Sequence, residues 1–204
     1  MKIKVVPVGD YEANCYILMD EASKDIVVID PGDEANIIIH EIENFNGTLK
    51  YVLLTHGHSD HTGAVTEVAK HFKVPAFISE DDKKLIDKTS FMFGKLQDDE
   101  TIIENIEEKE NFKIGNIDIS YIKTPGHSPG GICFLVENKL FSGDTLFAGS
   151  IGRTDFEGGD FDTIINSIKE NLFVLAETTL VYPGHGPSST IKQEKTYNPF
   201  FNMY

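Results

Sequence analysis

The chain has 204 residues, of which 40% are hydrophobic and 25% charged, a composition typical of a globular protein with one buried core. We therefore expect a single domain over residues 1–204. The formal net charge of −15 and the lack of a basic stripe exclude nucleic acid as an expected partner. The absence of a long apolar stretch and of a secretory signal at Met1–Val8 predicts no membrane partner and a cytoplasmic location.

The first half of the chain mixes strands with helices. Apolar periodicity predicts, in chain order, strands at 3–8, 14–19 and 25–29, a helix at about 34–45, a strand at 49–54, a helix over 65–72 and a strand at 75–79. The run at 49–54 is almost continuously apolar, which indicates a strand buried on both faces. Residues 80–111 form an acidic, partly helical excursion, in which Phe91, Met92 and Phe93 are expected to line a pocket or join the core.

The second half begins with strands and ends with a helix and a strand. The expected elements are strands at 117–123, 131–136 and 139–142, a helix at about 161–172 and a strand at 179–182. Adjacent strand pairs together with strand–helix alternation favour a layered α/β architecture. Cys15 and Cys133 lie in apolar strand-like runs and are expected to be buried free thiols. His40 and His71 fall within the expected helices, where a structural or solvent-facing role is expected.

The first cluster of chemically active residues is the run Thr55-His56-Gly57-His58-Ser59-Asp60-His61, directly after the buried strand. An extended His-x-His places both rings on one side of the chain, as two ligands of one ion require. Asp60 and His61, after a turn, can face a second ion. Imidazole and carboxylate are suitable ligands for Zn, Mn or Fe. The alternative, a polar turn that caps a helix, leaves the crowding of three imidazoles unexplained.

Two further histidines follow strands in matching Pro-Gly-His frames, His127 and His185. One carboxylate remains, Asp144 in Gly143-Asp144-Thr145, which taken alone would be a turn residue. Five histidines and two aspartates suit two divalent ions that keep coordination positions open for water. We expect zinc, with iron or manganese as alternatives.

In order and spacing, these motifs resemble the metallo-β-lactamase superfamily and, within it, the single-domain glyoxalase II-like branch, which is hydroxyacylglutathione hydrolase-like. The resemblance also covers Asp30-Pro31-Gly32 and Gly152-Arg153-Thr154-Asp155. It implies a four-layer αββα sandwich with the metals at one edge of its sheets. It assigns His56, His58 and His127 to a first ion, and Asp60, His61 and His185 to a second. Asp144 would bridge the two ions, and Asp30 would orient a ligand imidazole from behind.

The expected activity is hydrolysis of an activated acyl bond in a small molecule, with a thioester as the best candidate. Two ions would lower the pKa of a bound water, and Asp60 and Asp144 are the expected catalytic carboxylates. A thiol has a pKa of about 8.5, so its thiolate leaves without a dedicated general acid. Arg153 is the expected cation for a substrate carboxylate, and an ion pair with Asp155 or Asp160 is the alternative.

Two other functions remain open at this point. One is a non-haem iron persulfide dioxygenase of the same superfamily, which uses ligands like His56, His127 and Asp144. The other is an inactive regulatory or binding protein of the same fold, although such proteins usually lose ligands. Two-domain glyoxalase II enzymes hold glutathione with a C-terminal helical domain, so those contacts are not carried over to the short segment after His185. The sequence leaves the oligomeric state open, and the apolar tail Pro199-Phe200-Phe201 is expected to dock on its own domain.

Overall fold

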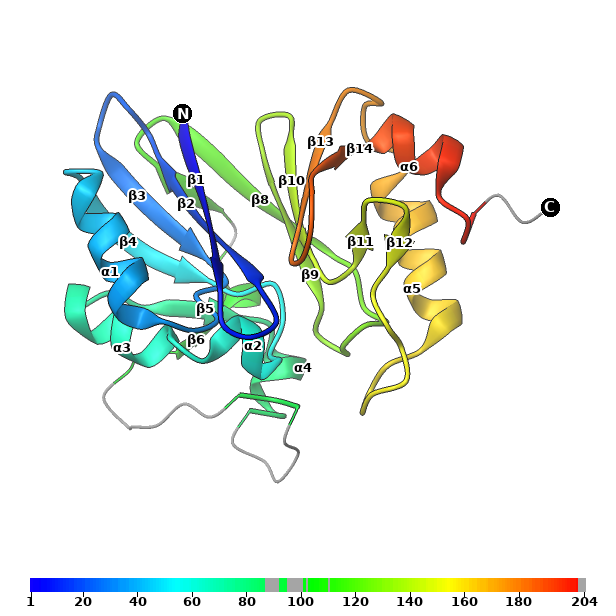
Figure 1. Cartoon of the computed structure of the whole chain (residues 1–204), viewed down its shortest axis with the longest axis horizontal. Helices are drawn as coiled ribbons and strands as arrows, with labels where there is room; N and C mark the ends of the chain where they lie inside the picture. The colour runs from blue at the N-terminus through cyan, green and yellow to red at the C-terminus, as the bar shows by residue number, and fades with distance from the viewer. Residues whose placement is uncertain (87–91, 95–100, 102, 110, 202–204) are drawn as a thin grey trace.

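Two six-stranded sheets pack face to face between two outer layers of helices, as Figure 1 shows. This computed structural model describes residues 1–86, 92–94, 101, 103–109 and 111–201. The four layers confirm the αββα sandwich expected from the resemblance. Within the described ranges, none of the helices combines the length and apolar character needed to cross a membrane.

The first sheet has the strand order β1-β2-β3-β4-β5-β6. Its strands are β1 (Lys2–Val8), β2 (Ala13–Met19), β3 (Asp25–Ile29), β4 (Thr48–Leu53), β5 (Ala76–Ile78) and β6 (Ile103–Asn105). The pairs from β1 to β3 are antiparallel, whereas those from β3 to β6 are parallel. The carboxyl ends of β3, β4 and β5 therefore meet at one edge of the sheet. Helices α1 (Ala35–Asn44) and α3 (Val65–Phe72) cover its outer face.

The second sheet has the order β14-β13-β10-β9-β8-β7. Its strands are β7 (Phe112–Ile114), β8 (Ile117–Lys123), β9 (Ile132–Val136), β10 (Lys139–Gly143), β13 (Leu180–Pro183) and β14 (Ser189–Thr190). Strands β10 and β13 are parallel, and β8 runs in the same direction because β9 is antiparallel to both of its neighbours. Helix α5 (Phe161–Ser167), the π-helical turn η2 (Ile168–Leu172) and helix α6 (Ile191–Tyr197) cover this sheet.

The remaining elements are short. They are α2 (Ser59–Thr62), α4 (Glu80–Lys83), the 3₁₀ turn η1 (Ile106–Glu108) and a hairpin of β11 (Leu146–Phe147) and β12 (Ser150–Ile151). The sequence predicts none of β6, β7, β11, β12 and β14, because two or three residues carry no measurable periodicity. Helix α6 was also missed because its sequence is mainly polar, and the strand expected at 179–182 is not the last.

Three apolar clusters fill the spaces between the four layers. The strand β2 contributes to two of them, since Cys15 and Ile17 face the helical layer of the first sheet while Tyr16 and Leu18 face the second sheet. Strand β4 is likewise buried on both faces, as its apolar run predicts. The third cluster lies between the second sheet and its helices.

The cysteines and the apolar tail behave as the sequence predicts. Cys15 and Cys133 are fully buried and free. The ring centroid of Phe201 lies 4.7 Å from that of Phe173, so the tail packs on the chain's own helical layer.

Candidate metal centre

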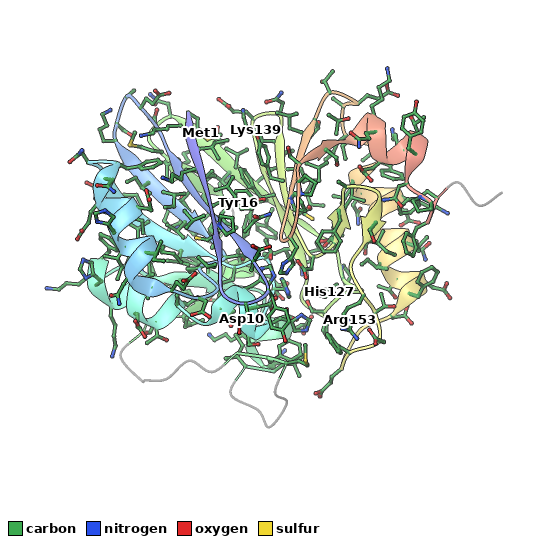
Figure 2. The ribbon with its side chains drawn as sticks, in the orientation of Figure 1. Met1, Asp10, Tyr16, His127, Lys139 and Arg153 are labelled. Carbon is green, nitrogen blue, oxygen red and sulfur yellow. The ribbon has the colours of Figure 1, made fainter. Side chains whose placement is uncertain are left out.

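All seven side chains that the sequence predicts as metal ligands lie at one edge of the two sheets, five of them on loops and two, Asp60 and His61, in the short helix α2. Strands β4, β8, β10 and β13 end there, and each leads directly into a loop that carries one or more of these residues. Figure 2 shows His127 and Arg153 at this edge, with Lys139 at the opposite end of the second sheet. The tertiary fold thus brings together donors that are up to 129 positions apart in sequence, namely His56 and His185. Asp30, which follows β3, also reaches this edge.

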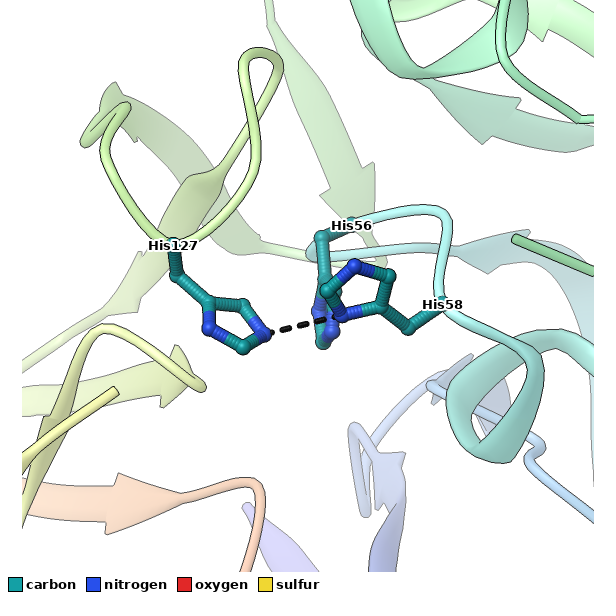
Figure 3. A group of neighbouring side chains, drawn as sticks. All are labelled: His56, His58 and His127. Carbon is teal, nitrogen blue, oxygen red and sulfur yellow. Dashed lines mark hydrogen bonds between the residues drawn. The ribbon is translucent and has the colours of Figure 1, made fainter. Parts of the chain in front are cut away.

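The first group consists of His56, His58 and His127, whose nearest ligand atoms all lie within 4.8 Å of one another. His58 Nδ1 lies 2.9 Å from His127 Nε2, the contact drawn in Figure 3. The His56 ring centroid is 4.8 Å from the centroids of both other rings. All three side chains are almost completely buried. Three imidazoles in this arrangement can hold one metal ion.

The second group consists of Asp60, His61 and His185, which also lie within 4.8 Å of one another. His185 Nε2 is 3.2 Å from Asp60 Oδ2 and 3.3 Å from His61 Nε2. Asp144 stands between the two groups: its Oδ1 is 3.3 Å from His61 Nε2, and its Oδ2 is 3.6 Å from His127 Nε2. The structure therefore places Asp144 where the resemblance implies a bridging carboxylate.

Four of the five imidazoles are held through their outer nitrogen, Nδ1, by a neighbouring oxygen. These contacts are His56 to Thr55 Oγ1 at 3.0 Å, His61 to Asp30 Oδ2 at 3.0 Å, His127 to the Arg153 carbonyl at 2.8 Å, and His185 to the Tyr11 carbonyl at 3.0 Å. A carbonyl oxygen only accepts, so Nδ1 carries the proton in the last two rings. The inner nitrogen, Nε2, is then left as a lone pair that faces the other donors, which is the form a metal ligand requires.

Several buried polar atoms at this centre lack a hydrogen-bond partner in the part of the chain that the structure describes. They are His56 Nε2, His58 Nε2 and Asp144 Oδ1, of which the last keeps only its ion-pair contact with His61. An unsatisfied buried polar atom costs about 1–3 kcal/mol, so three of them in one cluster call for a physical reason. A bound cation would supply it for atoms that face the interior of the cluster. The donor set of imidazole and carboxylate fits divalent Zn, Fe or Mn.

The charges of the donors also suit a cation. Burial and the neighbouring imidazoles lower the pKa of His58 to about 3, and the same causes lower the pKa of His56. Burial raises the pKa of Asp144, but the His61 charge and hydrogen bond outweigh it, so the net pKa of that carboxyl lies well below its usual range. Conversely, burial lowers the pKa of His61, yet Asp144 and Asp30 more than compensate and raise it. At neutral pH, His56 and His58 are therefore neutral and Asp144 is ionised. These are the protonation states in which imidazole and carboxylate bind a metal ion.

The loop of His185 is held by residues that sequence reasoning missed. Asn14 Nδ2 donates to the Pro183 and Gly186 carbonyls, both at 3.0 Å, and Tyr16 donates to the Pro183 carbonyl at 2.5 Å. A Cβ on Gly184 would lie 2.1 Å from Asp144 Oδ1, so only glycine allows the loop to pass this close. The one available signal was Asn14, a polar residue at the start of an otherwise apolar strand.

A cavity of about 440 Å³ opens over the donors. Besides five of the expected ligands, it is lined by Tyr11, Ser59, Met92, Arg153 and Phe156. Of the residues at 91–93, which were expected to line a pocket or join the core, Met92 lines the cavity. Phe93 is buried, with its ring centroid 4.9 Å from that of His58, and Phe91 lies outside the described residues.

The structure shows the ion pair between Arg153 and Asp155, one of the two roles that the sequence left open for this arginine. Its Nε and Nη2 donate to the two carboxylate oxygens of Asp155, each at 2.7 Å, and its guanidinium lies 3.6 Å from the Phe156 ring centroid. Although it is paired with Asp155, Arg153 remains half-exposed and lines the cavity. Asp160 is not its partner, because its carboxylate caps α5 through the Thr163 N–H at 2.8 Å.

The family model described as Metallo-beta-lactamase superfamily matches residues 8–185. The chain belongs to this superfamily. It is a metallo-hydrolase in the broad sense of that family, and its histidine and aspartate groups are able to bind metals.

Two curated relatives match along nearly their whole length. The chain is 40% identical to the hydroxyacylglutathione hydrolase GloC of Haemophilus influenzae, over 99% of both proteins. It is 37% identical to the probable metallo-hydrolase YqgX of Bacillus subtilis, over 100% of this chain and 99% of that protein.

Solved structures agree with the fold. The BLEG-1 B3 metallo-β-lactamase superposes with a TM-score of 0.88 at 34% identity, covering 98% of this chain and 100% of that one. TTHA1623 in a di-iron-bound form gives 0.83 at 30%, covering 97% and 99%. ETHE1 from Myxococcus xanthus gives 0.80 at 26%, covering 98% and 84%. These structures share the fold of this chain at identities of 26–34%.

Proposed function

We propose that this protein is a single-domain thioesterase, a metallo-hydrolase that cleaves small acyl-thioester substrates at a two-ion centre. The observation that carries the proposal is the convergence of seven donors at one edge of the sheets, five of which line one cavity, with His56 Nε2 and His58 Nε2 buried without a hydrogen-bond partner among the described residues. The similarity to a hydroxyacylglutathione hydrolase supports a thioester as the substrate class. Zinc is the proposed metal, and the di-iron form of a similar structure keeps iron as the alternative.

In this proposal, His56, His58 and His127 would hold one ion, Asp60, His61 and His185 would hold the other, and Asp144 would be a ligand of both. Ions bound there supply a Lewis acid for the substrate carbonyl and a water of lowered pKa. The imidazoles would bind through the nitrogens that face the other donors, and the outer contacts hold four of the rings in place for this.

Asp60 is the residue best placed to orient the attacking water. Burial raises the pKa of Asp60, but a hydrogen bond from His185 and the charge of His61 lower it overall, so the carboxylate is ionised at neutral pH. An ionised carboxylate at the cavity wall accepts a hydrogen bond from water and aims its lone pair at the substrate.

The kind of leaving group can be inferred from the side chains that are not metal ligands. The three histidines that line the cavity, His58, His127 and His185, all serve as ligands in this proposal, so none of them remains to protonate a leaving amine. A thiolate needs no such acid, because the pKa of its thiol is about 8.5. The site therefore favours a thioester over an amide such as a β-lactam.

Arg153 is proposed to bind a carboxylate of the substrate. Asp155 occupies one edge of the guanidinium, and the remaining N–H groups are available to a ligand in the cavity. We expect Arg153→Ala to raise KM about 5- to 10-fold for a thioester that carries a carboxylate, with little change for a neutral thioester. Asp155→Ala removes the competing carboxylate and is expected to lower that KM. Equal effects on both substrates would contradict this role.

The competing activity is oxidation of a persulfide at a single iron. That chemistry would use His56, His127 and Asp144, and it would leave the close grouping of Asp60, His61 and His185 without a function. The two-ion hydrolase accounts for both groups and is therefore preferred.

The test begins with the metal content of the purified protein. The protein is then assayed with S-lactoylglutathione, with the β-lactam nitrocefin, and for oxygen uptake with glutathione persulfide. Two ions per chain with preferential thioester turnover are expected. One iron with oxygen uptake would replace the proposal by the dioxygenase, and a protein without bound metal or turnover would favour a regulatory role. His58→Ala is the discriminating variant, since it should weaken the first ion of the hydrolase yet leave a dioxygenase iron bound.

A further inference from the structure

Asp82 is a buried carboxylate that stands beside the metal centre without belonging to either donor group. It lies in α4, which follows β5 at the same edge of the first sheet. Its side chain is fully buried. It does not line the cavity over the donors, so it is not expected to touch substrate.

The two oxygens of Asp82 nevertheless contact both loops that carry the first donor group. Oδ2 accepts hydrogen bonds from Gly57 N–H and Ser128 Oγ–H, both at 2.8 Å, and Oδ1 accepts one from Gly130 N–H at 2.7 Å. Gly57 stands between His56 and His58, and Ser128 directly follows His127. One carboxylate thus joins a loop of the first sheet to a loop of the second.

The contact with the second loop depends on a close approach of backbone to backbone. A Cβ on Gly130 would lie 2.2 Å from Ser79 Oγ and 2.7 Å from the Asp82 nitrogen. Ser79 is in turn fixed, because its Oγ accepts from Asp81 N–H at 3.3 Å and caps α4. The start of α4 is therefore a rigid support against which the loop after His127 rests.

The free-energy cost of burying Asp82 couples the His56–His58 loop to the His127 loop. A carboxylate without compensating hydrogen bonds is costly to bury. The three hydrogen bonds described for Asp82 all come from the metal-centre loops, so the compensation is complete only when both loops are in place. In that arrangement, His58 Nδ1 and His127 Nε2 are 2.9 Å apart.

We propose that Asp82 is a positioning residue that sets the separation of the His56–His58 loop from the His127 loop and thereby the affinity for the first ion. This rests on the proposed function only in that these three imidazoles bind an ion. The role is distinct from that of Asp30, which contacts an imidazole directly.

The variants for the test are Asp82→Ala, Asp82→Asn and Ser128→Ala. The matched control is Asp20→Ala, because Asp20 is also a buried carboxylate that accepts three local hydrogen bonds, but in the turn after β2. Two readouts are used besides melting temperature. One is the imidazole ¹H–¹⁵N NMR spectrum of the metal-free protein, and the other is Co²⁺ affinity measured by competition with a chelator.

We expect Asp82→Ala to shift the His58 and His127 ring signals and to lower the affinity for one of two Co²⁺ ions by about 10- to 100-fold. Asp82→Asn should have a smaller effect, because its amide oxygen keeps part of the hydrogen bonding. Ser128→Ala removes one hydrogen bond and should act in the same direction, while Asp20→Ala should lower only the melting temperature.

Unchanged ring signals and unchanged Co²⁺ affinity in Asp82→Ala would overturn the positioning role. If that variant does not fold, the same two measurements on Ser128→Ala decide the matter. A wild-type protein that binds no Co²⁺ would instead overturn the proposed function. The spectra of the metal-free protein still test the positioning role in that case.

Discussion

Thr55 immediately precedes the first histidine, and its replacement by valine tests how the centre prepares a ligand for an ion. The Thr55 hydroxyl donates to Asp30 Oδ2 at 2.6 Å and accepts from His56 Nδ1 at 3.0 Å. Valine has nearly the same shape but has no hydroxyl. In Thr55→Val, the Nδ1 proton of His56 therefore loses its acceptor in a fully buried setting.

The magnitude follows from these two contacts. Losing a hydrogen bond to a carboxylate costs about 1.5–3 kcal/mol, and leaving a buried N–H without a partner costs about 1–3 kcal/mol. The sum, about 2.5–6 kcal/mol, corresponds to a fall in melting temperature of roughly 5–24 °C for a chain of this size. The proton of His56 is also free to move to Nε2, where it would block the lone pair that faces the centre. Metal affinity should then fall about 10- to 100-fold, as for other partners of ligand imidazoles.

Thr124→Val is the matched control. Thr124 is equally buried, and its hydroxyl contacts Thr145 Oγ1 at 3.0 Å and Cys133 Sγ at 3.3 Å but no imidazole. We expect it to cost about 1 kcal/mol without changing metal affinity. The assays are thermal unfolding of the metal-free protein and Zn²⁺ affinity by chelator competition. Equal Zn²⁺ affinity in the two variants would refute the reasoning, whatever their melting temperatures.

Two further predictions concern the pH dependence of stability and the packing of the His185 loop. The pKa of His58 is lowered to about 3 in the folded protein, so below pH 6.5 only the unfolded chain gains this proton, and stability is lost as the pH falls. As the pH falls from 6 to 4, the unfolding free energy of metal-free His58→Gln should therefore decrease less steeply than that of wild type. The difference in slope, measured by urea unfolding, should be up to about 1.4 kcal/mol per pH unit. Parallel curves would show that His58 does not titrate this way. Gly184→Ala should reduce bound metal, measured by elemental analysis, because the new Cβ would lie 2.1 Å from Asp144 Oδ1 and 2.7 Å from His61 Cε1. Gly149→Ala, whose Cβ meets nothing within 4 Å, should keep its metal and cost only about 1–2 kcal/mol for its positive φ.

Local sequence was sufficient for much of the fold and for the identity of the clustered residues. Long strands such as β2 and β4 are predictable because their apolar runs extend over several side-chain periods. His56, His58 and His61 are recognisable because neighbouring residues on one turn stay close whatever the rest of the chain does. The Pro-Gly-His frames of His127 and His185 marked two more loops in the same way.

Only the tertiary structure decided what surrounds these residues. Asn14 and Pro183 are 169 positions apart, and Asp82 and Ser128 are 46 apart, yet each pair is hydrogen-bonded. Such contacts join a side chain to a distant loop, often to its backbone, so they leave no spacing or periodicity in the sequence. The role of Arg153 was open for a different reason, since an ion pair with Asp155 and a position in the cavity are equally compatible with its sequence. The sequence thus indicated which residues can bind metal. The packing of the two sheets determined how these residues meet and what orients them, because the donors lie on segments of both sheets that come together only in the packed sandwich.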